Sequence, residues 1–254
     1  MKRLSIPAMC LLAVCAYAQD PAADGAGGYP QFRNISGLPG GGFGVRPDGT
    51  VGISGALALT TPIAYSLRSR YYVAVAGAMS FDMTPRFNFD DDDELASMNG
   101  TAALLGGFSS PNLDLTVGGL LLSSIGDTVL NLHASPTKAF GGLRFGVGVQ
   151  DVFNTGGEYG HLDPRGPGDS RSIYGVVTHE FAESRVYASL GIGSNRFNDG
   201  FGNVSVPLGD LARGYLEYDG KWVGFGAAYG AGNFTLLAGV TDGKYLVYSA
   251  AYRF

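Results

Sequence analysis

Lys244-Tyr-Leu-Val-Tyr-Ser-Ala-Ala-Tyr-Arg-Phe254 is the stretch of sequence that decides the fold. Side chains of an extended strand alternate between its two faces. One face of this stretch is apolar and ends on an aromatic residue; it carries Leu246, Tyr248, Ala250, Tyr252 and Phe254. The other face is small and mixed, with Tyr245, Val247, Ser249, Ala251 and Arg253. This pattern predicts a strand with lipid on the first face and a barrel lumen on the second.

A last strand that ends on Phe254 resembles the terminal strand of bacterial outer-membrane β-barrels. The resemblance implies that the aromatic end is read by the barrel-insertion machinery and that outer-membrane lipids surround the protein. The alternative interpretation of the same stretch is an edge strand of a soluble β-sandwich.

The same alternation recurs upstream, between turn signals such as Asp219-Gly-Lys221 and Asp242-Gly-Lys244. In one segment Phe145 and Val147 alternate with Gly146 and Gly148. Strands are expected near 50–59, 70–81, 99–108, 112–124, 127–134, 140–153, 172–181, 185–194, 200–207, 211–219, 221–229, 233–241 and 244–254. No segment keeps a helical apolar period, so helix content near zero is expected.

The predicted fold is an antiparallel transmembrane β-barrel of 12–14 strands. Single-chain bacterial barrels have an even number of strands, whereas the ranges above give 13. Either residues 31–47 hold a further strand or one range is spurious. Short inner turns alternate along the chain with longer outer loops, which include 82–98 and 154–171. This order of short and long connections favours the presence of a further first strand.

The amino-terminal residues predict export. Lys2 and Arg3 precede an apolar stretch, and Ala16-Tyr-Ala18 supplies small residues for cleavage after residue 18. Lipidation of Cys15 is the alternative. Residues 1–18 are therefore interpreted as a signal peptide, 19–47 as a Gly/Pro-rich leader or first irregular strand, and 48–254 as the barrel. Removal of the signal peptide would leave no cysteine, since Cys10 and Cys15 are the only two.

The composition argues against some classes of function. The formal net charge of −5 becomes −7 without Lys2 and Arg3, and no basic stripe is present, which argues against nucleic-acid binding. The 41 glycines lie inside apolar runs, which suits small lumen-facing positions of a closed barrel. The glycine run at 37–44 lacks the Lys-Ser/Thr of a phosphate-binding loop, and no cofactor is predicted.

Five residues are predicted to line the lumen: Arg144, Gln150, Arg213, Glu217 and Arg253. Leu246, Tyr248, Tyr252 and Phe254 are predicted to face lipid and to carry the insertion signal. Charged lumen residues suit either a wet, selective pore or a closed internal ion-pair network. Both interpretations stay open at this point.

Other chemistry-bearing groups are few. The acidic run Asp90, Asp91, Asp92, Asp93 and Glu94 lies in a long predicted loop and is a weak candidate for calcium, since a solvated charge run explains it. No metal site is otherwise predicted. His179 beside Ser172 or Ser184 is a candidate for half of a hydrolase site, without the G-x-S-x-G elbow. No catalytic residue is assigned.

Phe197-Asn-Asp-Gly-Phe-Gly-Asn-Val-Ser-Val-Pro207 and Tyr215-Leu-Glu-Tyr-Asp-Gly220 resemble the repeating pattern of exopolysaccharide-associated outer-membrane barrel proteins. Thr60-Thr-Pro-Ile63 is similar to a Thr-Pro motif near the start of that family. The resemblance implies a role near surface polysaccharide export, and it brings no catalytic residues.

The predicted function is therefore an outer-membrane barrel, acting as a passive porin-like channel or as a structural membrane protein and not as an enzyme. Small solutes or polysaccharide are its expected partners. An outer-membrane hydrolase of the lipase or protease type and a soluble secreted β-sandwich are the alternatives.

Overall fold

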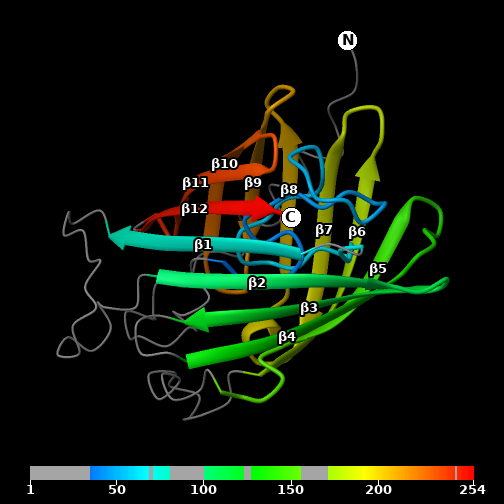
Figure 1. Ribbon diagram of the computed structural model, residues 1–254, viewed down its shortest axis with the longest axis horizontal. Helices are drawn as coiled ribbons and strands as arrows, with labels where there is room; N and C mark the ends of the chain where they lie inside the picture. The colour runs from blue at the N-terminus through cyan, green and yellow to red at the C-terminus, as the bar shows by residue number, and fades with distance from the viewer. Residues whose placement is uncertain (1–34, 69–70, 81–99, 123–126, 156–170, 244) are drawn as a thin grey trace.

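The wall of the protein is a closed barrel of twelve antiparallel strands (Figure 1). The computed structural model describes residues 35–68, 71–80, 100–122, 127–155, 171–243 and 245–254. The strands are β1 (Tyr71–Ser80), β2 (Gly100–Ser109), β3 (Leu113–Leu122), β4 (Asp127–Pro136), β5 (Leu143–Gln150), β6 (Ser172–Phe181), β7 (Val186–Gly193), β8 (Phe201–Pro207), β9 (Ala212–Tyr218), β10 (Val223–Ala231), β11 (Phe234–Thr241) and β12 (Tyr245–Arg253).

Each strand pairs with its neighbours in the sequence, and β1 closes the barrel against β12, from Tyr72 opposite Arg253 to Ser80 opposite Tyr245. An antiparallel barrel of this kind leaves no free sheet edge. The soluble sandwich is therefore wrong as an architecture, because a single closed sheet replaces two packed ones. The predicted barrel is confirmed, with 12 strands.

The strand predicted at 50–59 is the spurious one. In the described part of the chain, residues 35–68 form only isolated bridges among themselves, such as Val45 with Ala56. The loop parity that favoured an extra first strand was therefore misleading. Among the described residues the wall begins at Tyr71, because residues 35–68, called the inner segment below, lie inside the barrel. The predicted division between residues 47 and 48 falls within it.

The remaining twelve predicted strands match β1–β12 within a few residues at each end. Helix in the described ranges is limited to the 3-10 turn η3 (Asn195–Phe197). No helix in those ranges is long and apolar enough to cross a membrane. Connections at the end that holds the carboxyl terminus are short, for example Gly232 and Asn233 between β10 and β11. We call this the short-turn end and the opposite one the long-loop end.

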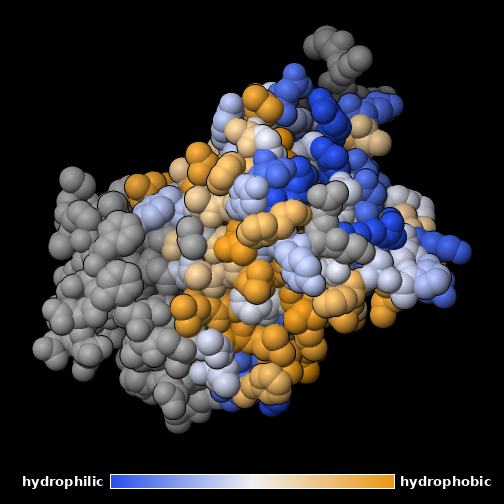
Figure 2. Space-filling model, in the orientation of Figure 1, coloured by the Kyte–Doolittle hydropathy of each residue, from blue (hydrophilic) through white to orange (hydrophobic). Residues whose placement is uncertain are grey.

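The outward side chains form an apolar belt. On β5, Val147 is 62% exposed whereas the neighbouring Gly146 and Gly148 are buried. Apolar residues gather over the middle of the strands in Figure 2, and hydrophilic ones toward the short-turn end. Exposed aromatic residues mark that end, namely Tyr71, Phe108, Phe140, Phe234 and Phe254. An apolar band edged by aromatic side chains is typical of a barrel in a bilayer.

Candidate functional site

The lumen of the barrel is occupied by the inner segment. Most of its apolar side chains are buried, and those of Phe43, Leu57 and Ile63 are 0% exposed. They form one cluster with inward residues of the wall, and the Phe43 ring lies 3.9 Å from the Tyr72 ring, centroid to centroid. The apolar core of the segment is therefore shared with inward residues of β1–β4, β7 and β9–β12.

Glycines on the inner face of the wall give the segment room. A methyl group on Gly118 would overlap the carbonyl oxygen of Gly37, and one on Gly230 would come within 2.8 Å of Ile53 Cβ. Real Cβ atoms do not approach neighbours so closely, so these positions require glycine. The glycine-rich wall strands thus match the shape of the backbone that they enclose.

Glu217, on β9, holds the turn at residues 59–61. Its carboxylate accepts hydrogen bonds from the backbone N–H groups of Leu59 at 3.0 Å, Thr60 at 3.1 Å and Thr61 at 3.3 Å. The hydroxyl groups of Thr60 and Thr61 donate to the same carboxylate at 3.0 and 2.9 Å. This carboxylate is buried, and charge-assisted hydrogen bonds of this kind are about twice as strong as neutral ones.

Next to Glu217, a second polar group fastens the segment at the long-loop end. Arg196 in η3 donates to Gln150 Oε1 at 3.0 Å and to the Thr60 carbonyl at 3.3 Å, and its Nη2 lies 3.5 Å from Asp219 Oδ2. Gln150 in turn donates to the carbonyl of Ser36 at 3.0 Å. One hydrogen-bonded network therefore holds the start of the inner segment at Ser36 and its turn at Thr60.

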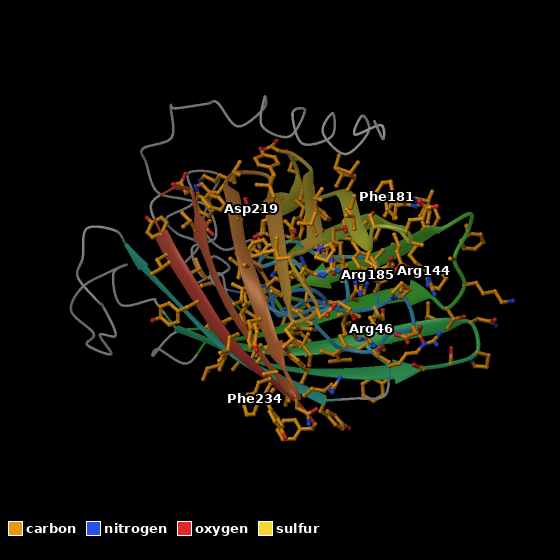
Figure 3. All side chains as sticks on the ribbon, turned by 90° about the horizontal axis from the view of Figure 1, so that it is seen from above. Arg46, Arg144, Phe181, Arg185, Asp219 and Phe234 are labelled. Carbon is orange, nitrogen blue, oxygen red and sulfur yellow. The ribbon has the colours of Figure 1, made fainter. Side chains whose placement is uncertain are left out.

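At the short-turn end, three wall arginines contact residues 46–54, called the inner hairpin below. Arg144 donates to the Pro47 carbonyl at 2.9 Å, and Arg253 to the Val51 carbonyl at 2.6 Å. Arg213 donates to the carbonyls of Ile53 at 2.8 Å and Ser54 at 3.2 Å. Arg46, Arg144 and Arg185 lie on the same side of Figure 3, away from Asp219.

Wall hydroxyl groups complete the contacts with the segment. The N–H groups of Ala64 and Leu67 donate to Thr178 Oγ1 and Thr116 Oγ1, each at 2.8 Å. The N–H of Leu57 donates to Ser205 Oγ at 3.2 Å. Sequence reasoning missed these hydroxyls, together with Asn131, Arg196 and Asn203. The one available signal was the connection at 60–69, which is unusually long for the inner side of the barrel.

The structure places the five predicted lumen residues against the inner segment. Arg144, Gln150, Arg213, Glu217 and Arg253 each hydrogen-bond a residue between Ser36 and Thr61. On β12, Val247, Ser249 and Ala251 are buried, whereas the alternate positions that were expected to face lipid lie on the outer side, namely Leu246, Tyr248, Tyr252 and Phe254.

The three stretches that carry the polysaccharide-related resemblance contact one another. Glu217 of 215–220 binds Thr60 and Thr61 of 60–63. Asn203 also donates to Thr61 Oγ1 at 2.9 Å. The resembling residues therefore build the attachment of the inner segment to the wall.

The structure separates Ser172 from His179 in the candidate hydrolase site. Ser172 and His179 lie at opposite ends of β6, about 23 Å apart for an extended strand. His179 lines an apolar depression of about 170 Å³ on the outer wall, with Leu190 and Val204. The Ser184 hydroxyl donates to the Phe181 carbonyl at 3.1 Å.

Two further predictions concern residues outside the described ranges. The acidic run from Asp90 to Glu94 and the amino-terminal residues with Cys15 both lie there. In the ranges that are described, no group of three or more His, Cys, Asp or Glu side chains could hold a metal ion. His133 is buried on β4, and its Nδ1 lies 2.9 Å from the Tyr174 hydroxyl.

No family model and no curated protein matches this chain. Among solved structures, the KdgM porin in complex with disordered oligogalacturonate is 11% identical over 72% of this chain and 99% of its own, with a TM-score of 0.44. The NanC porin is 10% identical over 72% and 98%, with a TM-score of 0.43. An outer membrane channel from Pseudomonas putida is 10% identical over 76% and 97%, with a TM-score of 0.42. Likenesses this low carry no argument about function, which is drawn below from the contacts of this chain.

Proposed function

We propose that this chain is an integral outer-membrane barrel, exported by its signal peptide, and that it is a porin-like channel closed at rest by the inner segment. The belt of outward apolar residues supports insertion in a bilayer, because a soluble protein rarely exposes so large an apolar patch. The aromatic residues at the short-turn end suit the interface between hydrocarbon and water.

One observation carries the channel assignment: the wall is complete without the inner segment. The pairing of β1 with β12 closes the barrel, and in the described ranges no strand ladder joins residues 35–68 to it. The attachment consists of side-chain hydrogen bonds, such as those of Glu217 and Arg213, and of apolar contacts such as that of Phe43 with Tyr72. None of these contacts is part of the backbone pairing of the wall. Water can replace such bonds, so the segment can leave the lumen without breaking the sheet.

The inward face of the wall suits a wet lumen. Polar side chains occur on the inward face of every strand from β2 to β9 and on β11 and β12, and many other positions are Gly or Ala. The polar ones include Thr116, Asn131, Gln150, Thr178, Asn203, Ser205, Arg213, Glu217 and Ser249. Such groups are tolerated inside a barrel when water or a partner satisfies them. A permanently dry core would be expected to be apolar throughout.

A structural membrane protein is the second candidate, and the close fit of Gly118 and Gly230 to the inner segment favours it. In that case the segment would be a permanent filling and no current would flow. A link to surface polysaccharide export remains a proposal that rests on the resemblance. Recognition of the Phe254 end by the insertion machinery is likewise a proposal.

A disulfide that locks the segment tests the channel. An ideal Cβ on Gly42 lies 3.9 Å from Ser249 Cβ, inside the range of about 3.5–4.5 Å found in disulfides. We expect single-channel openings of the full chain in a planar bilayer to disappear in the oxidised Gly42→Cys/Ser249→Cys variant and to return on reduction.

The single variants are the controls for this experiment. Gly42 has a φ of 82°, so Gly42→Cys alone reports the strain of a side chain at that position. A current that is the same in the oxidised and the reduced double variant would show that the segment is not the gate. Absence of current in every correctly folded sample would favour the structural role.

A further inference from the structure

The three wall arginines at the short-turn end are bound to neutral acceptors. The contacts of Arg144, Arg213 and Arg253 with the inner hairpin all end on backbone carbonyl oxygens. Their other acceptors are neutral as well, being the oxygens of Pro136, Arg185, Ser205 and Asn233. In the described ranges no carboxylate lies within ion-pair distance of any of the three guanidinium groups.

The nearby acids are already engaged. Asp114 lies 2.9 Å from Arg68 Nε in an ion pair. Glu180 accepts a hydrogen bond from the Tyr187 hydroxyl at 2.9 Å. Glu217 lies toward the long-loop end and binds residues 59–61. The hydrogen bond from Tyr187 leaves the charge of Glu180 in place, and this carboxylate acts on Arg213 from beyond ion-pair distance. The three guanidinium groups at the short-turn end of the lumen are therefore balanced only in part by the wall.

Two of the arginines also keep an unused donor. The Nε–H groups of Arg144 and Arg253 are buried and have no hydrogen-bond partner. Arg213 is itself only 1% exposed. A buried guanidinium on neutral carbonyls is poorly compensated, because its desolvation is offset by dipoles alone. An oxyanion would satisfy these groups better than the hairpin does, since a guanidinium pairs with carboxylate, phosphate or sulfate through two parallel hydrogen bonds.

The three arginines come from β5, β9 and β12, so they approach the inner hairpin from different parts of the wall. When the hairpin moves, they are left as a set of cations around one end of the lumen. Charge of one sign in a narrow passage with low-dielectric walls concentrates the opposite ion.

We propose that the opened channel selects anions, and that Arg144, Arg213 and Arg253 bind a solute that carries carboxylate, sulfate or phosphate groups. The inner hairpin occupies this site at rest by presenting its carbonyl oxygens to the same donors. This inference rests on the proposed channel function.

The reversal potential of the full chain under a tenfold KCl gradient tests the proposal. Chloride is expected to permeate more readily than potassium by a factor of about 3 or more. Citrate is expected to interrupt the current at concentrations at which the neutral trisaccharide raffinose does not. If openings of the unchanged chain are too rare to measure, Glu217→Gln is used to raise the opening frequency. This substitution weakens the attachment of the inner segment at residues 59–61.

Arg144→Gln and Arg253→Gln are expected to lower the chloride preference stepwise and to weaken the citrate block. Both side chains are only partly buried, so these variants remain informative if Arg213→Gln fails to fold. Lys138→Gln is the matched control, because Lys138 is an exposed cation in the turn at the same end. The chloride preference of the Lys138→Gln variant is expected to equal that of the unchanged chain.

The outcomes separate this inference from the channel function. Absence of current from folded protein overturns both. A current without preference for chloride, or with preference for potassium, overturns the anion site and leaves the channel standing. A chloride preference that survives both arginine substitutions shows that other groups select the ion, and it overturns the assignment to these residues.

Discussion

Glu217 on β9 and Thr61 in the inner segment are joined twice, because the amide and the hydroxyl of Thr61 both donate to Oε2 of Glu217, at 3.3 and 2.9 Å. The amide and hydroxyl of Thr60 donate to the same carboxylate. A single buried side chain thus satisfies most of the donors of one turn. Counting Leu59, five donor groups of the inner segment share this one carboxylate.

Replacing Glu217 by Gln is expected to loosen the inner segment. The shape is kept, but one acceptor oxygen becomes an NH₂ group that faces the N–H and O–H donors of Thr60 and Thr61. The loss is expected to be about 2 kcal/mol, so amide hydrogen exchange at residues 57–63 should accelerate about 30-fold. Glu183→Gln, in an exposed turn, is the control. Equal exchange in the two variants would contradict this role of Glu217.

Adjacent glycines on β3 are expected to differ sharply in their tolerance of alanine. A methyl group on Gly118 would overlap the carbonyl of Gly37 inside the barrel, whereas one on Gly119 meets no atom closer than 4.0 Å on the outside. Gly118→Ala should lower the free energy of unfolding by about 1–3 kcal/mol, and Gly119→Ala should leave it unchanged or raise it slightly. Urea unfolding in detergent measures both. Similar stability of the two variants would argue against a filled lumen.

Two equally exposed apolar residues are expected to respond differently to charge. Val147 in the middle of β5 is 62% exposed, and Leu208 in the turn after β8 is 61% exposed. In a bilayer, Val147→Arg should lower the free energy of unfolding by about 2–4 kcal/mol, and Leu208→Arg by no more than about 1 kcal/mol. Unfolding from phospholipid vesicles provides the measurement. A soluble protein would tolerate both substitutions equally.

The inner hairpin is expected to loosen in acid through Asp48. Burial raises the pKa of the Asp48 carboxyl, but hydrogen bonds from the hydroxyl and the N–H of Thr50, together with the charge of Arg46, outweigh it, so the pKa lies below its usual value. A lowered pKa in the folded state stabilises the hairpin above the ordinary Asp value. This contribution is lost as the pH falls below about 4.

Thr50→Val tests this assignment, because valine keeps the shape of threonine without its hydroxyl donor. The pKa of Asp48 is expected to rise toward its ordinary value in an NMR titration. Thr137→Val is the matched control, because it makes the same change in the turn between β4 and β5, where the Thr137 hydroxyl donates to Pro111, and it is expected to leave the pKa of Asp48 unchanged. An Asp48 pKa that does not respond to Thr50→Val would show that the Thr50 hydroxyl is not what lowers it.

The strands of the wall were predictable because their signal is local. Alternation along β5 and β12 separates Val147 from Gly148 and Tyr248 from Ser249 without any knowledge of the neighbouring strands. The same period placed Arg144, Arg213, Glu217 and Arg253 on one side of their strands. The error at 50–59 arose because that stretch also contains extended residues, which pair within the inner segment and not with the wall.

By itself, the sequence determined that this chain forms a barrel wall with an apolar outer face, because the alternation of side chains follows from the geometry of each strand. Only the tertiary structure decided what fills the lumen. The bond between Thr61 and Glu217 joins residues 156 positions apart. No periodicity along the chain encodes such a contact, because it exists only once the barrel has closed around the segment.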